Sequence, residues 1–182
     1  MKTRNFYILI AAIFVSLFVF WLTIYAFIIL KVDLFQDTKT LTIRGTGIKT
    51  EISISIDELK SDKYLQIEDY SFDIVNSFEN EYSIIYSGVS LWSILEMENL
   101  LNKDPSELTF QFWGRDAYHS PKPLNLSIAQ NNPSLVILAY EQNGASLFEE
   151  GPLRSVIDDS IMPEGEYSSQ YSVQKLTSIV IE

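Results

Sequence analysis

The sequence predicts an α+β domain preceded by one N-terminal transmembrane helix. One observation is a run without any charged residue, from Phe6 to Leu30. A second is a series of about six short segments after residue 40 that alternate apolar and polar residues or are continuously apolar, as strands do. A third is a set of two or three short helical segments between these strands. Scattered strands and short helices of this kind are typical of α+β architecture.

The uncharged run from Phe6 to Leu30 exceeds the roughly 20 apolar residues that cross a bilayer as a helix. A secretory signal peptide would have an apolar region of only about 7 to 15 residues, followed by a small-x-small cleavage site. The segment Lys31 to Phe35 offers no such site. A buried core helix is the other alternative, but a run that is apolar on every face suits lipid better. We therefore predict an uncleaved membrane anchor.

Basic residues at the ends of this run predict its orientation. Lys2 and Arg4 precede it and only Lys31 closely follows it, so the positive-inside rule predicts a cytoplasmic N-terminus. The expected localisation is single-pass membrane, with the C-terminal domain extracytoplasmic. The predicted domains are 1–30, the cytoplasmic N-terminus and transmembrane helix, then a linker at 31–39 and a soluble domain at 40–182.

The charge of the soluble part limits its partners. All 24 acidic residues and 11 of the 13 basic residues follow Leu30, which leaves a formal charge of −13. Such a charge disfavours nucleic acid, and we predict no nucleic-acid partner. The expected partners are membrane lipid, through Phe6 to Leu30, and a membrane or exported protein. The chain has no cysteine, so it has neither a disulfide nor a thiolate ligand.

Several elements are predicted from local pattern. Ser55 and Glu58 have the spacing of a capping box at the start of a short helix. Gly88 predicts a turn, and Ser90 is the predicted N-cap of a helix with Leu91 and Ile94 on its apolar face. The predicted strands are Leu41 to Arg44, Glu51 to Ile56, Tyr82 to Tyr86, Leu108 to Trp113, Leu135 to Tyr140 and Lys175 to Ile181.

Three further segments complete the pass along the chain. Lys60 to Tyr86 shows no single period and predicts irregular structure up to its last strand. Leu124 to Gln130 predicts a short helix. Asn143 and Gly144 predict a tight reversal with positive φ after the strand that ends at Tyr140, followed by a return strand.

The order and spacing of several short motifs resemble the oxidoreductase molybdopterin-binding domain family, which includes sulfite oxidase. The resemblance implies a mixed β-sheet domain of the sulfite oxidase type over most of residues 40 to 182. The motifs are Ser53 to Leu59, Gly88 to Leu95, Trp113 to Tyr118, Leu138 to Leu147, Gly151 to Arg154 and Tyr171 to Leu176.

The resemblance also implies a metal ligand that this chain lacks. Family members hold molybdenum through the dithiolene of the pterin and one cysteine thiolate, a soft ligand that stays bound through changes of oxidation state. The corresponding position falls between Ile67 and Ser77, where Asp69, Ser71 and Asp73 offer only oxygen. No catalytic residue and no metal ligand is therefore predicted.

The resemblance further implies a phosphate-binding side of the pterin site. Family members commonly have a neutral donor and a small residue before Pro-x-Arg, whereas this chain has Glu149 and Glu150 before Gly151, and two carboxylates repel an anion. Arg154 and Lys175 match basic positions of the family and are the predicted cofactor-binding residues. The alternative for Arg154 is an ion pair with a nearby acid, and for Lys175 a solvated strand end. We predict no bound cofactor; molybdopterin enters through the resemblance only.

Other chemistry-bearing residues have structural alternatives. His119 is the only histidine, so no second imidazole or thiolate completes a transition-metal site. Asp116 could orient His119, but the sequence identifies no nucleophile at a defined geometry beside the pair. Asp158 and Asp159 lack a regular calcium-ligand spacing and predict a solvated loop.

Two functions follow as hypotheses. The first is a membrane-anchored, exported domain without a catalytic molybdenum centre, which binds a ligand or a partner. The second is an active oxidoreductase that binds a pterin or another redox cofactor without a protein thiolate.

Overall fold

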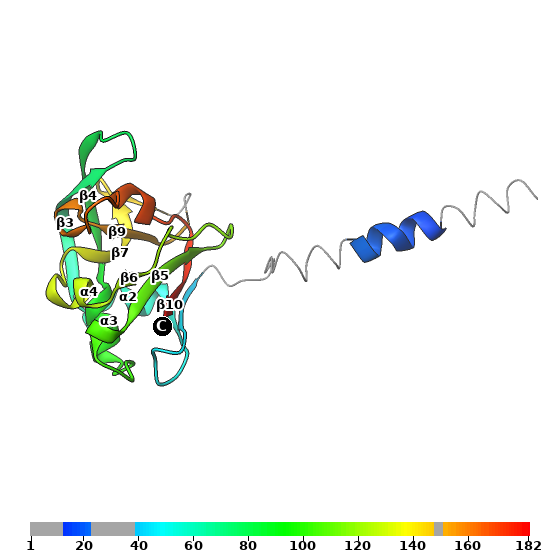
Figure 1. Ribbon diagram of the computed structural model, residues 1–182, viewed down its shortest axis with the longest axis horizontal. Helices are drawn as coiled ribbons and strands as arrows, with labels where there is room; N and C mark the ends of the chain where they lie inside the picture. The colour runs from blue at the N-terminus through cyan, green and yellow to red at the C-terminus, as the bar shows by residue number, and fades with distance from the viewer. Residues whose placement is uncertain (1–12, 23–38, 148–150) are drawn as a thin grey trace, which may run out of the picture. The chain divides into compact units, whose positions relative to one another are not determined.

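The computed structural model describes residues 13–22, 39–147 and 151–182. Contacts divide the chain into two units, Met1–Gln36 and Asp37–Glu182. In the first unit the described residues form a helix over 13–22. The second unit is a mixed α/β domain with two sheets (Figure 1).

The predicted transmembrane helix is contradicted. Across the described parts of the chain, no helix has both the length and the apolar character needed to cross a bilayer. The single-pass localisation, with a cytoplasmic N-terminus and an extracytoplasmic domain, loses its basis with it. The rest of the run from Phe6 to Leu30, and the linker up to residue 38, lie outside the described residues.

The described residues of the second unit form ten strands and several short helical segments. Their order is β1 (Thr40–Arg44), β2 (Ile52–Ser55), α2 (Ile56–Leu59), β3 (Gln66–Val75), β4 (Glu81–Ser90), α3 (Leu91–Met97), η1 (Pro105–Glu107), β5 (Thr109–Gly114), β6 (Leu124–Asn125), α4 (Ser127–Asn131), β7 (Val136–Gln142), β8 (Ala145–Ser146), β9 (Arg154–Ile157), η3 (Asp159–Ile161), η4 (Ser168–Tyr171) and β10 (Leu176–Ile181).

The strands form two sheets of five. The first has the order β2-β1-β10-β5-β6, in which β1 and β10 run parallel and the other pairs are antiparallel. The second has the order β3-β4-β7-β8, with β9 also paired to β7, and every pair in it is antiparallel. The predicted fold class, one mixed-sheet domain of the sulfite oxidase type behind a transmembrane helix, is therefore wrong. The long-range pairing of β1 with β10 could not be read from local alternation.

The main core lies between the two sheets. It combines Leu41 and Phe112 of the first sheet, Val89 and Leu138 of the second, and Ile94 of α3, all of them fully buried. Alternate residues of β7 point to opposite faces, as the pleat of a strand requires, so its other face belongs to a second cluster. That cluster comprises Phe72, Ile74, Tyr86, Ile137, Ala139, Leu147 and Val156.

Helix starts follow the predicted capping residues. The Ser55 hydroxyl accepts a hydrogen bond from the Glu58 N–H at 3.1 Å, and the Ser90 hydroxyl accepts one from Ser93 N–H at 3.2 Å. Each side chain satisfies a backbone donor that the first helical turn leaves free. Both predicted N-caps are confirmed.

Some predictions from local pattern are corrected. Gly88 is not in a turn but inside β4, where an added β-carbon would lie 2.6 Å from the Leu138 carbonyl oxygen, so the glycine permits close pairing with β7. The segment predicted as irregular contains the ten-residue strand β3. A register shift after Ile67 and a positive φ of 46° at Asp69 interrupt its alternation, which hid the strand.

The predicted reversal after β7 is confirmed. Asn143 and Gly144 have φ of 51° and 74°, the left-handed pair that a two-residue hairpin turn requires. The return strand β8 contains only Ala145–Ser146. The segment predicted as a helix from Leu124 to Gln130 begins instead with the short strand β6 and becomes helical at α4.

Candidate functional site

Three separate segments of the chain meet beside the end of β5. The loop that follows β5 is joined to the loop before β10 by a hydrogen bond from Arg115 N–H to the Lys175 carbonyl oxygen, 2.9 Å long. The segment before β9 joins the same group, because Leu176 N–H donates to the Leu153 carbonyl oxygen at 3.0 Å. Backbone bonds thus place two basic residues, Arg115 and Lys175, next to each other.

A small cavity opens at this junction. Its volume is about 20 Å³, enough for roughly one water-sized group and far below the roughly 300–1,000 Å³ of pockets that enclose a whole ligand. Such a cavity can receive one oxygen-rich group while the rest of a ligand stays outside. Its lining residues are Arg115, Gly151, Pro152, Lys175, Leu176 and Thr177.

The backbone at this site is fixed by close approach. Gly151 has φ 97° and Lys175 has φ 50°, both in the left-handed region. A β-carbon added to Gly151 would lie 2.6 Å from both Cα and Cγ of Lys175. Only glycine allows this approach, so Gly151 determines where the lysine side chain begins.

The charge at the site is positive within the described residues. Arg115 is exposed and Lys175 is half-buried. The ion pairs found among the described residues belong to Lys63 and Lys122, and none of them involves Arg115 or Lys175. Like charges repel and opposite charges attract, so two basic residues that line one cavity favour an anion there.

Arg154, the other predicted cofactor-binding residue, lies elsewhere. Its side chain is 8% exposed, and its Nη1 donates to Gln142 Oε1 at 2.7 Å and to the Tyr86 hydroxyl at 3.2 Å. It extends from β9 toward the second cluster and does not line the cavity. The structure therefore does not bring Arg154 and Lys175 to one site.

Arg115 is the site residue that the sequence did not single out. It was part of a motif, Trp113 to Tyr118, but nothing in local pattern distinguishes it from an ordinary exposed arginine. Its relation to Lys175 arises from the antiparallel pairing of β5 with β10, which joins residues 60 positions apart in the chain. The one sequence feature that bears on this position is Gly114, directly before Arg115. In the structure the glycine allows β5 to approach the loop before β10, because a β-carbon on Gly114 would lie 2.7 Å from the Gln174 carbonyl oxygen.

The remaining sequence candidates are not brought together. His119 packs on Trp113 with ring centroids 4.4 Å apart, whereas Asp116 accepts a hydrogen bond from Tyr118 N–H. Asp158 was predicted to lie in a solvated loop, and this prediction is wrong. The residue is 5% exposed and accepts hydrogen bonds from Asp73 N–H and from Ser160. Its polar neighbours are backbone and hydroxyl groups that need its carboxylate.

The positions that would replace the family cysteine do not form a metal site. Asp69 and Asp73 lie on β3, where the Ser87 hydroxyl lies 3.4 Å from Asp69 Oδ1 and the Ser83 hydroxyl donates to Asp73 at 2.6 Å. Over residues 13–22, 39–147 and 151–182, no group of three His, Cys, Asp or Glu side chains could hold a metal ion. The family's molybdenum centre does not fit this chain, because the chain has no cysteine to supply the thiolate ligand.

The largest pKa shifts lie outside the cavity lining. The Lys63 ammonium ion and the Tyr64 hydroxyl both hydrogen-bond Glu98 and hold the pKa of its carboxyl below its usual value. Burial, followed by the hydrogen bond to Glu98, raises the pKa of Tyr64 to about 12. These shifts are explained by burial, hydrogen bonds and ion pairs among Lys63, Tyr64, Glu58 and Glu98, none of which lines the cavity.

The sequence was compared with protein families and with curated proteins, and no match was found in either comparison.

Proposed function

We propose that this domain is a binding module that holds an anionic group, a carboxylate or a phosphate, between Arg115 and Lys175. The observation that carries the proposal is that two basic side chains from distant segments line one small cavity, with no acid among the described residues within ion-pair distance of either. Arginine and lysine are the residues that bind carboxylate and phosphate in proteins.

The cavity with its two basic residues contrasts with the acidic character of the rest of the chain. The part after Leu30 has a formal charge of −13, so its overall field repels anions. Lys63 and Lys122 are neutralised by Glu58, Glu98 and Glu166. A site in which two cations have no acidic partner among the described residues is therefore suited to an anion that comes from outside.

The experiment is a calorimetric titration of the full chain with inorganic phosphate and, separately, with acetate. Arg115→Met removes one cation, and Lys175→Asn removes the other while keeping a residue that tolerates positive φ. Arg44→Met and Lys103→Met, both at exposed positions, make the same charge changes elsewhere. We expect each site variant to weaken binding about tenfold or more, the effect of losing one charged hydrogen bond, and the controls to bind as the original chain does.

The two ligands separate the two anion classes. Tighter binding of phosphate assigns the site to phosphate-bearing ligands, and tighter binding of acetate assigns it to carboxylates. Absence of binding of both, or equal loss in site and control variants, contradicts the proposal. The active oxidoreductase is the competing hypothesis, and stoichiometric molybdenum by elemental analysis, or pterin fluorescence after oxidation, would favour it instead.

A further inference from the structure

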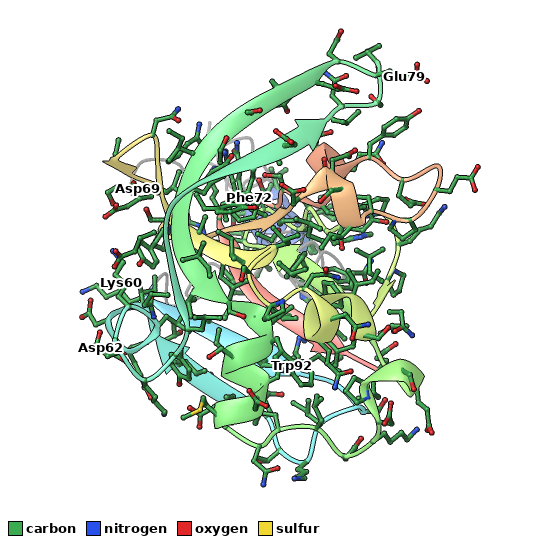
Figure 2. The ribbon with its side chains drawn as sticks, turned by 90° about the vertical axis from the view of Figure 1, so that its left-hand side faces the viewer. Lys60, Asp62, Asp69, Phe72, Glu79 and Trp92 are labelled. Carbon is green, nitrogen blue, oxygen red and sulfur yellow. The ribbon has the colours of Figure 1, made fainter. Side chains whose placement is uncertain are left out.

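Exposed apolar and acidic side chains gather on the β3–β4 hairpin. Figure 2 shows its two long strands extending beyond the neighbouring elements, with Glu79 at the tip. Each strand has ten residues, and β3 lies at the edge of its sheet. The hairpin therefore presents its tip and its outer face, whereas Phe72, Ile74 and Tyr86 on its inner face belong to the buried second cluster.

The tip is an ordered turn that displays an aromatic ring. The Asn76 side-chain oxygen accepts hydrogen bonds from Phe78 N–H at 2.9 Å and from Asn80 N–H at 3.1 Å, and Glu79 N–H donates to the Asn76 carbonyl oxygen at 2.8 Å. These bonds fix the backbone, yet the Phe78 side chain is 83% exposed. An aromatic ring held in water by a structured turn is typical of an anchor for a partner.

Further apolar side chains continue from the tip along the strands. Tyr82, Ile85 and Tyr70 are each more than two-fifths exposed. Tyr70 contacts Phe72 edge-on with ring centroids 5.0 Å apart, so its ring continues outward from the buried second cluster. The register of the two strands places Tyr70 and Tyr82 on one face and Ile85 on the other. Exposed apolar groups that share a face mark an interaction surface.

The charge of the hairpin is of one sign. From Gln66 to Ser90 there are five acidic residues and no lysine, arginine or histidine. All five are exposed, and none belongs to an ion pair found among the described residues. The acidic residues are Glu68, Asp69, Asp73, Glu79 and Glu81.

We infer that the β3–β4 hairpin is a docking surface for a basic protein segment that carries apolar side chains between its lysines or arginines. Complementary charge would position the segment, and Phe78 and Tyr82 would pack against its apolar residues. A second copy of this chain is a poor occupant because it presents the same acidic surface, and nucleic acid would be repelled by it.

The test uses a fluorescein-labelled synthetic peptide of alternating lysine and leucine, with a peptide of alternating glutamate and leucine as the control probe. Binding to the full chain is followed by fluorescence anisotropy. Because a cationic peptide is attracted to any acidic protein, each hairpin variant has a matched control with the same change of charge or apolarity. The pair Glu79→Gln with Glu81→Gln is matched by Glu107→Gln with Glu164→Gln, and Phe78→Ser is matched by Met97→Ser, all at exposed positions.

The inference predicts that the lysine peptide binds and the glutamate peptide does not. It also predicts that each hairpin variant weakens binding about tenfold, while its matched control changes binding by less than about twofold. Equal weakening in both members of a pair would mean attraction to net charge alone and would overturn the inference. Failure of the lysine peptide to bind, or binding of the glutamate peptide with equal affinity, would overturn it as well.

Discussion

A carboxylate oxygen of Asp158 accepts a hydrogen bond from the backbone N–H of Asp73, 2.9 Å away. Asp73 lies on β3, at the edge of the second sheet, and Asp158 follows directly after β9. Two positions along β3, Val75 N–H donates in the same way to the Ser168 hydroxyl at 2.9 Å. Side chains thus occupy backbone donors that an edge strand would otherwise leave free, and they limit unwanted strand pairing on this half of β3.

Asp158→Ala is expected to destabilise the domain by about 1–3 kcal/mol, because the part-buried hydrogen bonds from Asp73 N–H and Ser160 N–H lose their charged acceptor. Asp158→Asn keeps one acceptor oxygen and should cost less. Urea unfolding measures both. Glu164→Ala, at an exposed position, is the control and should change the free energy of unfolding by less than about 0.5 kcal/mol. An equal loss of unfolding free energy in Asp158→Ala and Glu164→Ala would contradict the role of Asp158 as the acceptor for the backbone donor of β3.

A comparison of Gly151→Ala with Gly144→Ala distinguishes two effects of the added β-carbon, a steric clash with Lys175 and strain of the backbone at positive φ. Both glycines have positive φ, so alanine costs roughly 1–3 kcal/mol of strain at either position. Only at Gly151 does the new β-carbon meet Lys175, because no heavy atom lies within 4 Å of a β-carbon at Gly144. We expect Gly151→Ala to be the more destabilising in urea unfolding and to weaken phosphate binding, with binding unchanged in Gly144→Ala. If Gly144→Ala were the more destabilising, the segments around Gly151 and Lys175 would be able to move apart without cost, which contradicts the prediction.

Glu98 should titrate below the usual range of a glutamate, since Lys63 and Tyr64 stabilise its ionised form. A carboxyl whose pKa is lowered on folding adds stability above its unfolded pKa, and this stability is lost as the pH falls through its folded pKa. Carbon-detected NMR of the Glu98 carboxyl measures the shift. Lys63→Met and Tyr64→Phe should each raise that pKa toward its ordinary value, and Lys49→Met, at another exposed lysine, should leave it unchanged. A Glu98 pKa that none of these variants alters would show that the network does not form.

Glu149 and Glu150 directly precede Gly151 in the sequence, although their structure lies outside the described residues. Carboxylates so near the cavity in sequence should oppose an incoming anion. Replacing both with Gln is expected to tighten phosphate binding several-fold, most clearly at low salt, where screening is weakest. Glu164→Gln with Glu107→Gln makes the same change of net charge as a control. Weaker phosphate binding after Glu149→Gln with Glu150→Gln would mean that these residues organise the site rather than oppose the anion.

Local pattern predicted the elements whose cause is local. The caps at Ser55 and Ser90 and the turn at Asn143 depend on residues close in sequence, and all three were found where expected. Strand β3 was missed because the irregularity at Asp69 breaks its alternation. The assignment of the strands to two sheets depends on pairings between distant segments, which alternation does not specify.

Of the two basic residues selected from the sequence, only one lines the cavity, because strand pairing between distant segments determines the cavity lining. Lys175 was identified through resemblance to a motif, and it does line the cavity. Arg154 was selected on equal grounds but points to Gln142 and Tyr86, because residues of β9 alternate between the two faces of the sheet. Arg115 reaches Lys175 only through the pairing of β5 with β10. The pairing of strands in the sheet thus decides which basic residues lie next to each other, and the sequence motifs around Arg115 and Lys175 do not.

The most direct test of the anion site is to follow backbone amide NMR signals of the full chain while inorganic phosphate is added. The account predicts saturable shifts centred on Arg115, Gly151, Lys175, Leu176 and Thr177, the cavity-lining residues that carry a backbone amide hydrogen. It also predicts that Lys175→Asn abolishes these shifts while the rest of the spectrum is preserved. Shifts that are absent, that spread evenly over basic residues such as Lys49 and Lys103, or that persist in Lys175→Asn would contradict the account.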